Sequence, residues 1–231
     1  MRLPGTVTFD LDGTLVDSVP DLSQALNYTL STLDLPPVPV ADVRSMVFGG
    51  ARPLIRRGAS AGGAILEDSV LEQAYGTYLA YYEDHVADTS DVFPSTRETL
   101  DYLASRGIVM AVCTNKAQIL SDALLRALDL DGYFVAVLGA DSVENQKPHA
   151  NHIVETVARA GGSLRDCIHV GDNSTDVEAA RNAGVPVVAV SYGYTQVPPS
   201  ELGADGLIDD MAALPQAMAR ILENGQAAKW R

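Results

Sequence analysis

Two carboxylates stand close together at the end of a short apolar run near the N-terminus. Asp10 and Asp12 follow the run at 6–9, and Gly13 and Thr14 come directly after them. Such a run is typical of a buried strand, and ligands bind at the carboxyl ends of strands in open α/β sheets. Aspartate is a poor strand former and is costly to bury without a partner. The pattern therefore favours a reactive site over its alternative, a turn with N-capping carboxylates.

Further polar groups follow three later apolar runs. Thr114 and Asn115 follow the second run, Lys147 opens a helical segment after the third, and Asp172 and Asp176 follow the fourth. In a parallel sheet these strand ends share one edge, so the residues should converge. Clustered carboxylates repel one another unless a divalent cation binds, and Mg²⁺ leaves coordination positions for a phosphate. Together with a lysine and neutral donors, this set predicts a phosphoryl-transfer site.

The elements that must position these residues alternate between strands and helices. Continuous apolar strands in such alternation predict an α/β fold with a doubly wound parallel sheet, a Rossmann-like core. At 95–98, Ser-Thr-Arg-Glu has the spacing of a capping box at one helix start. We expect strands at 6–9, 109–113, 134–138, 167–170, 187–190 and, more weakly, 206–208, and helices at 96–106, 119–128, 150–160, 176–183 and 211–222.

The interval between the first two strands is about a hundred residues, far longer than a crossover needs. It shows helical periodicity at 21–33, 41–47, 52–58 and 69–85. We therefore predict an inserted helical cap domain at 19–88, and an α/β core formed by 1–18 and 89–231. The tail after Leu222 is expected to fray.

Charge and composition exclude several classes of partner. The formal net charge of −14 argues against nucleic acid or an anionic membrane. There is no long apolar segment and no signal-peptide pattern, so we expect a cytoplasmic protein. Cys113 and Cys167 lie in apolar runs and are predicted to be reduced core residues; a disulfide between them is the less favoured alternative. Monomer and homodimer both stay open.

The motifs at 10–14 (Asp-Leu-Asp-Gly-Thr), 114–115, 147–148 and 171–176 occur in the order found in the haloacid dehalogenase-like hydrolase superfamily. The chain resembles this superfamily over nearly its whole length, including the cap. Within it, the segments at 9–18, 49–50 and 191–194 are most similar to the phosphoglycolate phosphatase-like group. The turn at 93–96 departs from that group's pattern.

The resemblance implies an aspartyl-phosphate mechanism. Asp10 attacks phosphorus, and Asp12 protonates the leaving oxygen and then deprotonates the attacking water. A dehalogenase does not need that acid/base, so phosphatase or phosphomutase chemistry is favoured.

The resemblance also implies the ligands of the metal and of the phosphate. Mg²⁺ would bind Asp10, Asp172 and the main-chain carbonyl of Asp12, with Asp176 either binding directly or lying one shell away and holding Lys147. Phosphoryl oxygens would be bound by Thr114, Asn115 and Lys147. Gly13 would let the backbone approach the phosphate.

The substrate is expected to be a small phosphorylated metabolite, with 2-phosphoglycolate first and a sugar phosphate or nucleotide as the alternative. The lysines are Lys116, Lys147 and Lys229, so none lies in the cap. This disfavours phosphonoacetaldehyde hydrolase and phosphomutase relatives, which use a cap lysine. A non-catalytic binding protein on this fold is less favoured because Asp10 and Asp12 are both present.

Four arginines without an acidic residue mark the cap between 43 and 66. We predict that Arg52, beside Gly49 and Gly50, binds a substrate carboxylate and that these three residues set specificity. A solvated helix face stays open as the alternative. The arginines are Arg44, Arg52, Arg56 and Arg57.

Two other groups are given structural roles. Tyr75, Tyr78 and Tyr82 share one helical face and predict packing inside the cap rather than a binding platform. His149 and His152 follow a helix start and are predicted to lie at the surface or cap the helix rather than bind a metal.

Overall fold

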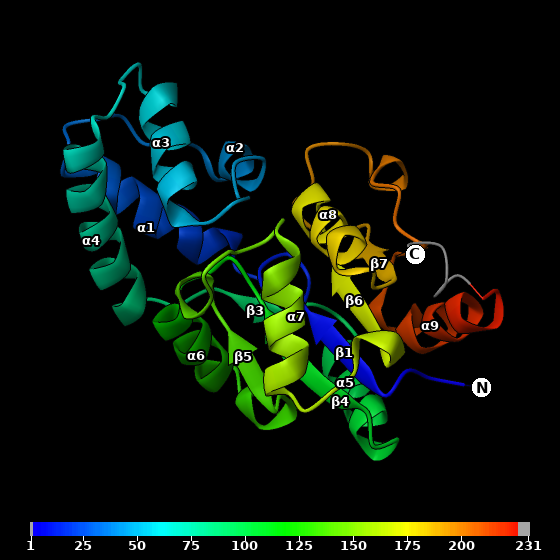
Figure 1. The fold of residues 1–231 in the computed structure, drawn as a ribbon. Coiled ribbons are helices and arrows are strands. Elements are labelled where there is room, and N and C mark those ends of the chain that lie inside the picture. The colour runs from blue at the N-terminus through cyan, green and yellow to red at the C-terminus, as the bar shows by residue number, and fades with distance from the viewer. Residues whose placement is uncertain (1, 226–231) are drawn as a thin grey trace.

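The computed structural model describes residues 2–225 and contains a central parallel sheet of six strands (Figure 1). The strand order β5-β4-β1-β6-β7-β8 places β1 between β4 and β6, so the carboxyl ends of these three strands are adjacent. The predicted doubly wound α/β sheet is thereby confirmed. The strands are β1 (Thr6–Phe9), β4 (Val109–Cys113), β5 (Ala136–Leu138), β6 (Cys167–Gly171), β7 (Val187–Val190) and β8 (Gly206–Ile208).

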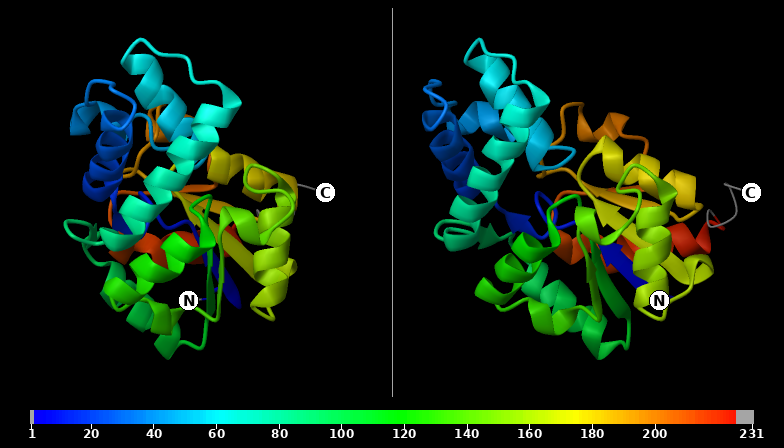
Figure 2. Two further views of the ribbon diagram at one scale, coloured as in Figure 1. Left: turned by 90° about the vertical axis from the view of Figure 1, so that its left-hand side faces the viewer. Right: turned by 60° about the vertical axis from the view of Figure 1, so that its left-hand side comes forward.

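Helices cover both faces of the sheet (Figure 2). Strand side chains alternate between the faces: Val7 and Phe9 belong to the apolar cluster that contains α5, α6 and α9 side chains, and Cys113 and Val187 to the cluster with α7 and α8. The helices are α5 (Thr96–Ser105), α6 (Gln118–Ala127), α7 (Ala150–Arg159), α8 (Ser174–Ala183) and α9 (Leu214–Glu223).

A helical cap lies beyond the carboxyl ends of the strands, at the upper left of Figure 1. A short antiparallel pair, β2 (Val16–Asp17) and β3 (Asp91–Val92), lies where the chain enters and leaves the cap. The sequence predicted the cap but not this pair. The predicted cap bounds of 19–88 stay a prediction. The cap helices are α1 (Val19–Ser31), α2 (Val40–Arg44), α3 (Ala51–Ala61) and α4 (Asp68–Asp84).

The predicted capping box at Ser95 is wrong. Ser95 has a left-handed backbone with φ of 60°, and its side chain makes no capping hydrogen bond to α5. A capping box occurs instead at the start of α8. There the Asn173 side chain accepts from the Thr175 N–H at 2.9 Å, and the Asp176 carboxylate accepts from the Asn173 N–H at 3.3 Å.

Most element boundaries lie within a few residues of prediction, and two differ because a 3₁₀ turn intervenes. The strand expected at 134–138 begins at Ala136 because a 3₁₀ turn, Asp131–Tyr133, ends on Phe134. The helix expected at 211–222 begins as a 3₁₀ turn and continues as α9 to Glu223. Of the tail expected to fray, residues 226–231 lie outside the described part of the chain.

Within residues 2–225 no helix is both long and apolar enough to cross a membrane. Cys113 and Cys167 are free and buried, as predicted. Burial raises the pKa of each thiol to about 12, so neither thiol is a reactive nucleophile near neutral pH.

Candidate functional site

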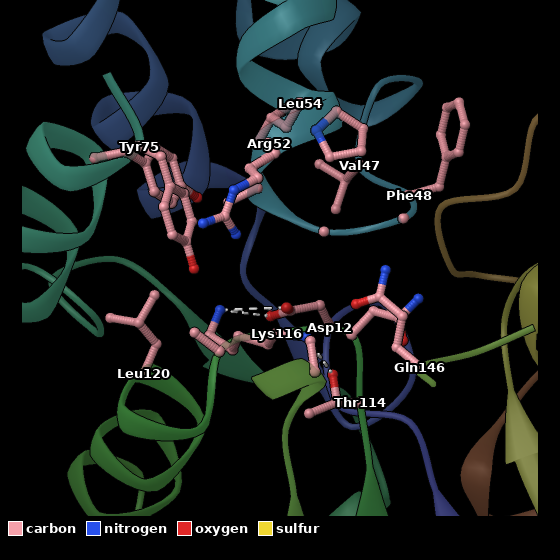
Figure 3. A pocket seen from close by; sticks show the side chains of 18 of the residues that line it. Asp12, Val47, Phe48, Arg52, Leu54, Tyr75, Thr114, Lys116, Leu120 and Gln146 are labelled. Atoms are coloured by element: carbon pink, nitrogen blue, oxygen red, sulfur yellow. Dashed lines mark hydrogen bonds and ion pairs between the residues drawn. The ribbon is translucent and has the colours of Figure 1, made fainter. Parts of the chain in front are cut away.

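A cavity of about 810 Å³ lies between the cap and the carboxyl ends of the strands. In Figure 3, Arg52 faces this space from the cap side, opposite Asp12, Thr114 and Lys116 on the core side. Most of the residues predicted from the sequence line the cavity; Gly13, Asp172 and Asp176 lie behind its wall. Those that line it are Asp10, Asp12, Thr114, Asn115, Lys147, Gly49, Gly50 and Arg52.

Lys147 is a fixed cation behind Asp10. Its Nζ lies 3.0 Å from Asp10 Oδ1 and 2.6 Å from Asp176 Oδ1, and its side chain is 1% exposed. Burial acts against the ammonium, but Asp10 and Asp176 hold the pKa of Lys147 above its usual value. The imidazole of His152 supports the segment, since its Nδ1 accepts the Lys147 N–H at 3.2 Å.

Carboxylate oxygens of Asp10, Asp172 and Asp176 all lie within 4.8 Å of one another, and the three residues are buried. Burial raises the pKa of Asp10 to about 6, although Lys147 opposes the shift. Burial, together with Asp176 and Asp10, also raises the pKa of Asp172. One lysine therefore does not balance the three carboxylates. A divalent cation such as Mg²⁺ would supply the missing positive charge, and it binds to hard oxygen ligands such as these carboxylates. The residues therefore fit that ion.

Asp176 differs from the other two carboxylates because each of its two oxygens is contacted by two hydrogen-bonding groups. Oδ1 contacts Lys147 and, at 3.2 Å, the ring of His169; Oδ2 accepts the N–H groups of Asp172 at 3.1 Å and Asn173 at 3.3 Å. Burial alone would raise its pKa, but Lys147 and His169 hold the pKa of Asp176 below its usual range. This geometry favours Asp176 as the residue that holds Lys147 and the start of α8.

Asp12 makes a separate set of contacts. Its Oδ1 accepts from the Ser18 hydroxyl at 2.6 Å, and Lys116 Nζ lies 3.1 Å and 3.2 Å from its two oxygens. Sequence reasoning counted Lys116 but gave it no role in the site. The available signal was its place directly after Thr114 and Asn115.

Thr114 and Asn115 lie directly before Lys116, and their side chains make hydrogen bonds with the main chain of Lys116 and Lys147. The Thr114 hydroxyl accepts the Lys116 N–H at 3.2 Å, and the Asn115 amide donates to the Lys147 carbonyl at 2.9 Å. Asn115 Oδ1 is buried and has no hydrogen-bond partner among residues 2–225. The loop is thus fixed to the lysine segment at the cavity wall.

The predicted glycines have distinct structural reasons. Gly13 has φ of +83°, and a Cβ there would lie 2.9 Å from the Tyr194 ring. The nearest group to that Cβ position is the carboxylate of Asp172, so a side chain at Gly13 would displace it. The predicted close approach to phosphate stays a prediction. Gly50 has φ of +92°, and a Cβ there would lie 3.0 Å from the Asn115 carbonyl oxygen. The cap loop at Gly49 and Gly50 thus packs directly on the core loop.

The cap arginines already have partners within the protein. Arg52 donates to both oxygens of Glu72, at 2.7 Å and 2.8 Å, and stacks over Tyr75 with its guanidinium carbon 3.6 Å from the ring centroid. Acidic residues outside the segment therefore pair with three of its four arginines. The others contact Asp17 (Arg44), Asp68 (Arg56) and the carbonyls of Met46 and Phe48 (Arg57).

The tyrosines and histidines match their predicted roles only in part. Tyr78 and Tyr82 are buried in the cap as expected, yet both also line the cavity with Tyr75. His149 caps α7 by accepting the N–H of Asn151. His152 is fully buried rather than at the surface, because its ring is enclosed behind the Lys147 segment.

Comparison with known proteins gives consistent matches over the whole fold. A haloacid dehalogenase-like hydrolase family model matches residues 7–190. The phosphoglycolate phosphatase of Caulobacter vibrioides is 44% identical over 217 residues, covering 94% of this chain and 92% of that protein. That of Agrobacterium fabrum is 42% identical over 221 residues, covering 95% of each. The crystal structure of a predicted phosphoglycolate phosphatase from Haemophilus somnus has a TM-score of 0.87 at 30% identity, covering 94% of this chain and 98% of that one.

Proposed function

The chain belongs to the haloacid dehalogenase-like hydrolase family, and we propose that it is a Mg²⁺-dependent phosphatase whose nucleophile is Asp10. One observation carries the proposal. A carboxylate at the end of a central strand faces a cavity, contacts a buried lysine, and lies within 4.8 Å of two further carboxylates. Carboxylates this close repel one another, and positive charge offsets the repulsion.

In the first half-reaction the Asp10 carboxylate attacks phosphorus, and the bond between phosphorus and the ester oxygen breaks. Lys147, with the Thr114 hydroxyl and the Asn115 N–H, binds the phosphoryl oxygens as charge moves onto them. Mg²⁺, held by Asp10, Asp172 and the main-chain carbonyl of Asp12, would supply the charge that lets an anionic nucleophile meet an anionic ester. Asp176 holds Lys147 in place.

Asp12 is the acid/base in this proposal. It lines the cavity and is 15% exposed at its side chain, so it can reach the leaving oxygen. It gives its proton to that oxygen as the ester bond breaks, and takes a proton from the water that hydrolyses the acyl phosphate on Asp10. Both products, inorganic phosphate and an alcohol, then leave the cavity.

We propose 2-phosphoglycolate as the substrate, because relatives at 44% and 42% identity carry the name phosphoglycolate phosphatase. Arg52 would bind the carboxylate of the ester, and Gly49 and Gly50 would set the distance between cap loop and core. The cavity of about 810 Å³ also has room for larger esters. A sugar phosphate or nucleotide is therefore the second candidate. Cytoplasmic localisation remains a prediction.

The test is a panel of phosphate esters assayed with and without Mg²⁺ and ranked by kcat/KM. We expect Mg²⁺-dependent hydrolysis with 2-phosphoglycolate ranked first, and loss of activity in Asp10→Asn. Asp131→Asn, which makes the same change at an exposed position, should behave as wild type. An inactive wild type, or full activity in Asp10→Asn, would overturn the proposed chemistry. Another ester at the top of the panel would overturn only the substrate.

A further inference from the structure

Lys116 joins the core of the molecule to the cap through its side chain. The residue follows the Thr114–Asn115 loop, and its side chain is 3% exposed. On the core side it contacts Asp12, with Nζ 3.1 Å and 3.2 Å from the carboxylate oxygens. On the cap side it contacts the hydroxyl of Tyr82, which lies 2.8 Å from the same Nζ. A single ammonium thus bridges Asp12 and a cap side chain.

Tyr82 belongs to α4 of the cap and is fully buried. The Lys116 Nζ also lies 4.3 Å from the centroid of its ring. Holding a lysine in a dry site is costly unless its charge is paired and its donors are used. Here a carboxylate and a phenol oxygen meet both requirements, and one of them comes from the cap.

We propose that Lys116 is a positioning residue that orients the Asp12 carboxyl toward the leaving oxygen. Through its hydrogen bond to Tyr82, this orientation depends on the position of α4. The inference rests on the acid/base role given to Asp12 in the proposed function. With the cap helix in place, Lys116 is held from both sides and Asp12 is fixed by Lys116 and Ser18. When α4 moves away, Lys116 loses its cap contact and Asp12 loses a firm support.

This arrangement makes a specific demand on the chemistry. Proton donation matters most when the leaving group is a poor one, such as an alkoxide, and little when it is a stable phenolate. A residue that acts by aiming the acid should therefore matter for alkyl esters and hardly for activated aryl esters. A residue needed only for folding would affect all esters by the same factor.

The experiment measures kcat/KM for a series of phosphate monoesters whose leaving groups span a wide range of pKa values. In Lys116→Met we expect a loss of about a hundredfold for alkyl esters and less than about threefold for p-nitrophenyl phosphate. The slope of log kcat/KM against leaving-group pKa should become steeper. Lys116→Arg, which can still donate to Asp12, should recover most of the loss.

Tyr82→Phe provides a second variant that removes one hydroxyl and keeps the ring. We expect a loss of about tenfold confined to alkyl esters, because one hydrogen bond to a charged group disappears. Tyr81→Phe makes the same change one residue away in α4, outside the cavity lining, and should leave all rates unchanged. Equal losses for every ester in both Lys116→Met and Tyr82→Phe would overturn the inference. If wild type hydrolyses no ester, the proposed function fails instead.

Discussion

Asp172 and Asp176 lie four residues apart in the sequence, yet their contacts suit them to different roles. Asp172 accepts from the Tyr194 N–H at 2.6 Å and from the Asn173 side chain at 2.7 Å. Asp176 is engaged by Lys147 and His169 on one oxygen and by the main chain on the other. Burial and nearby carboxylates raise the pKa of Asp172, a shift that a bound cation would oppose, in keeping with its proposed role as a metal ligand.

The first prediction separates these two roles by calorimetric titration with Mg²⁺. Asp172→Asn should abolish measurable binding, because it removes a direct carboxylate ligand. Asp176→Asn should weaken binding by about ten- to a hundredfold, as expected when a residue that orients the ligands is lost. A larger loss of affinity in Asp176→Asn than in Asp172→Asn would contradict the assignment.

At this scale the sequence predicted most of the site. Asp10, Asp12 and Asp172 were predicted because acidic residues directly after apolar strands are unusual, and Asp176 because it ends the polar segment 171–176 that follows the fourth strand. The role of Lys116 was not predicted, since its partner Tyr82 lies 34 residues away in a helix of another layer. Spacing along the chain carries no information about such a contact.

The elements that join cap and core depend on a buried carboxylate in α1. Asp21 is 1% exposed and accepts from Ser90 through the N–H at 2.8 Å and the hydroxyl at 2.6 Å. It also accepts from the N–H and the hydroxyl of Thr89. Asp21 therefore fastens the start of the cap to the segment by which the chain leaves it.

The second prediction concerns stability and pH. Burial opposes the charge, but hydrogen bonds from Ser90 and Thr89 hold the pKa of Asp21 below its usual value of 3.8. The folded form thus favours the carboxylate, and its contribution is present above about pH 4 and is lost as pH falls further. Asp21→Asn, which turns an NH₂ toward N–H donors, should lower the unfolding free energy by about 2 kcal/mol near neutral pH.

Urea denaturation of wild type and Asp21→Asn at neutral pH and at about pH 3 checks this sign. The difference between the two proteins should shrink in acid. Asp34→Asn, an exposed cap position with φ of 55° that asparagine tolerates, should be neutral at both. A difference that grows in acid would contradict the assignment.

The prediction of strands and helices succeeded where several consecutive residues carried an apolar pattern. The apolar runs at 6–9 and 187–190 became strands with the predicted bounds. The two-residue strands β2 and β3 have no such pattern, because pairing with each other defines them. The false capping box at Ser95 failed for a related reason: its left-handed φ is imposed by the turn entering α5, which residue types alone do not reveal.

At the scale of the whole molecule, the core supplies the reactive residues and the cap closes the cavity over them. The cap loop reaches the core at Gly50, and Arg52 faces the cavity from the first turn of α3. The guanidinium of Arg52 makes a bidentate pair with the carboxylate of Glu72, so a substrate carboxylate would bind in place of Glu72 or at the remaining N–H groups. In the proposed function, chemistry and substrate selection are therefore carried by different layers.

The third prediction follows from this division of labour. Arg52→Ala should lower kcat/KM for 2-phosphoglycolate by about tenfold or more, the usual effect of losing a charged hydrogen-bond pair. Hydrolysis of p-nitrophenyl phosphate, which has no carboxylate, should stay within about twofold. Arg159→Ala removes the same charge at an exposed position of α7, outside the cavity lining, and serves as the control. Unchanged kcat/KM for 2-phosphoglycolate in Arg52→Ala would show that another residue binds the carboxylate.

The central claim is that Asp10 carries the phosphoryl group between the two half-reactions. The most direct measurement is rapid acid quenching of the enzyme during turnover with Mg²⁺, followed by peptide mass mapping. The account predicts one added phosphoryl group on the peptide that contains Asp10, and none in Asp10→Asn. A phosphoryl group on any other residue, or Asp10→Asn that turns over as fast as wild type, would contradict it.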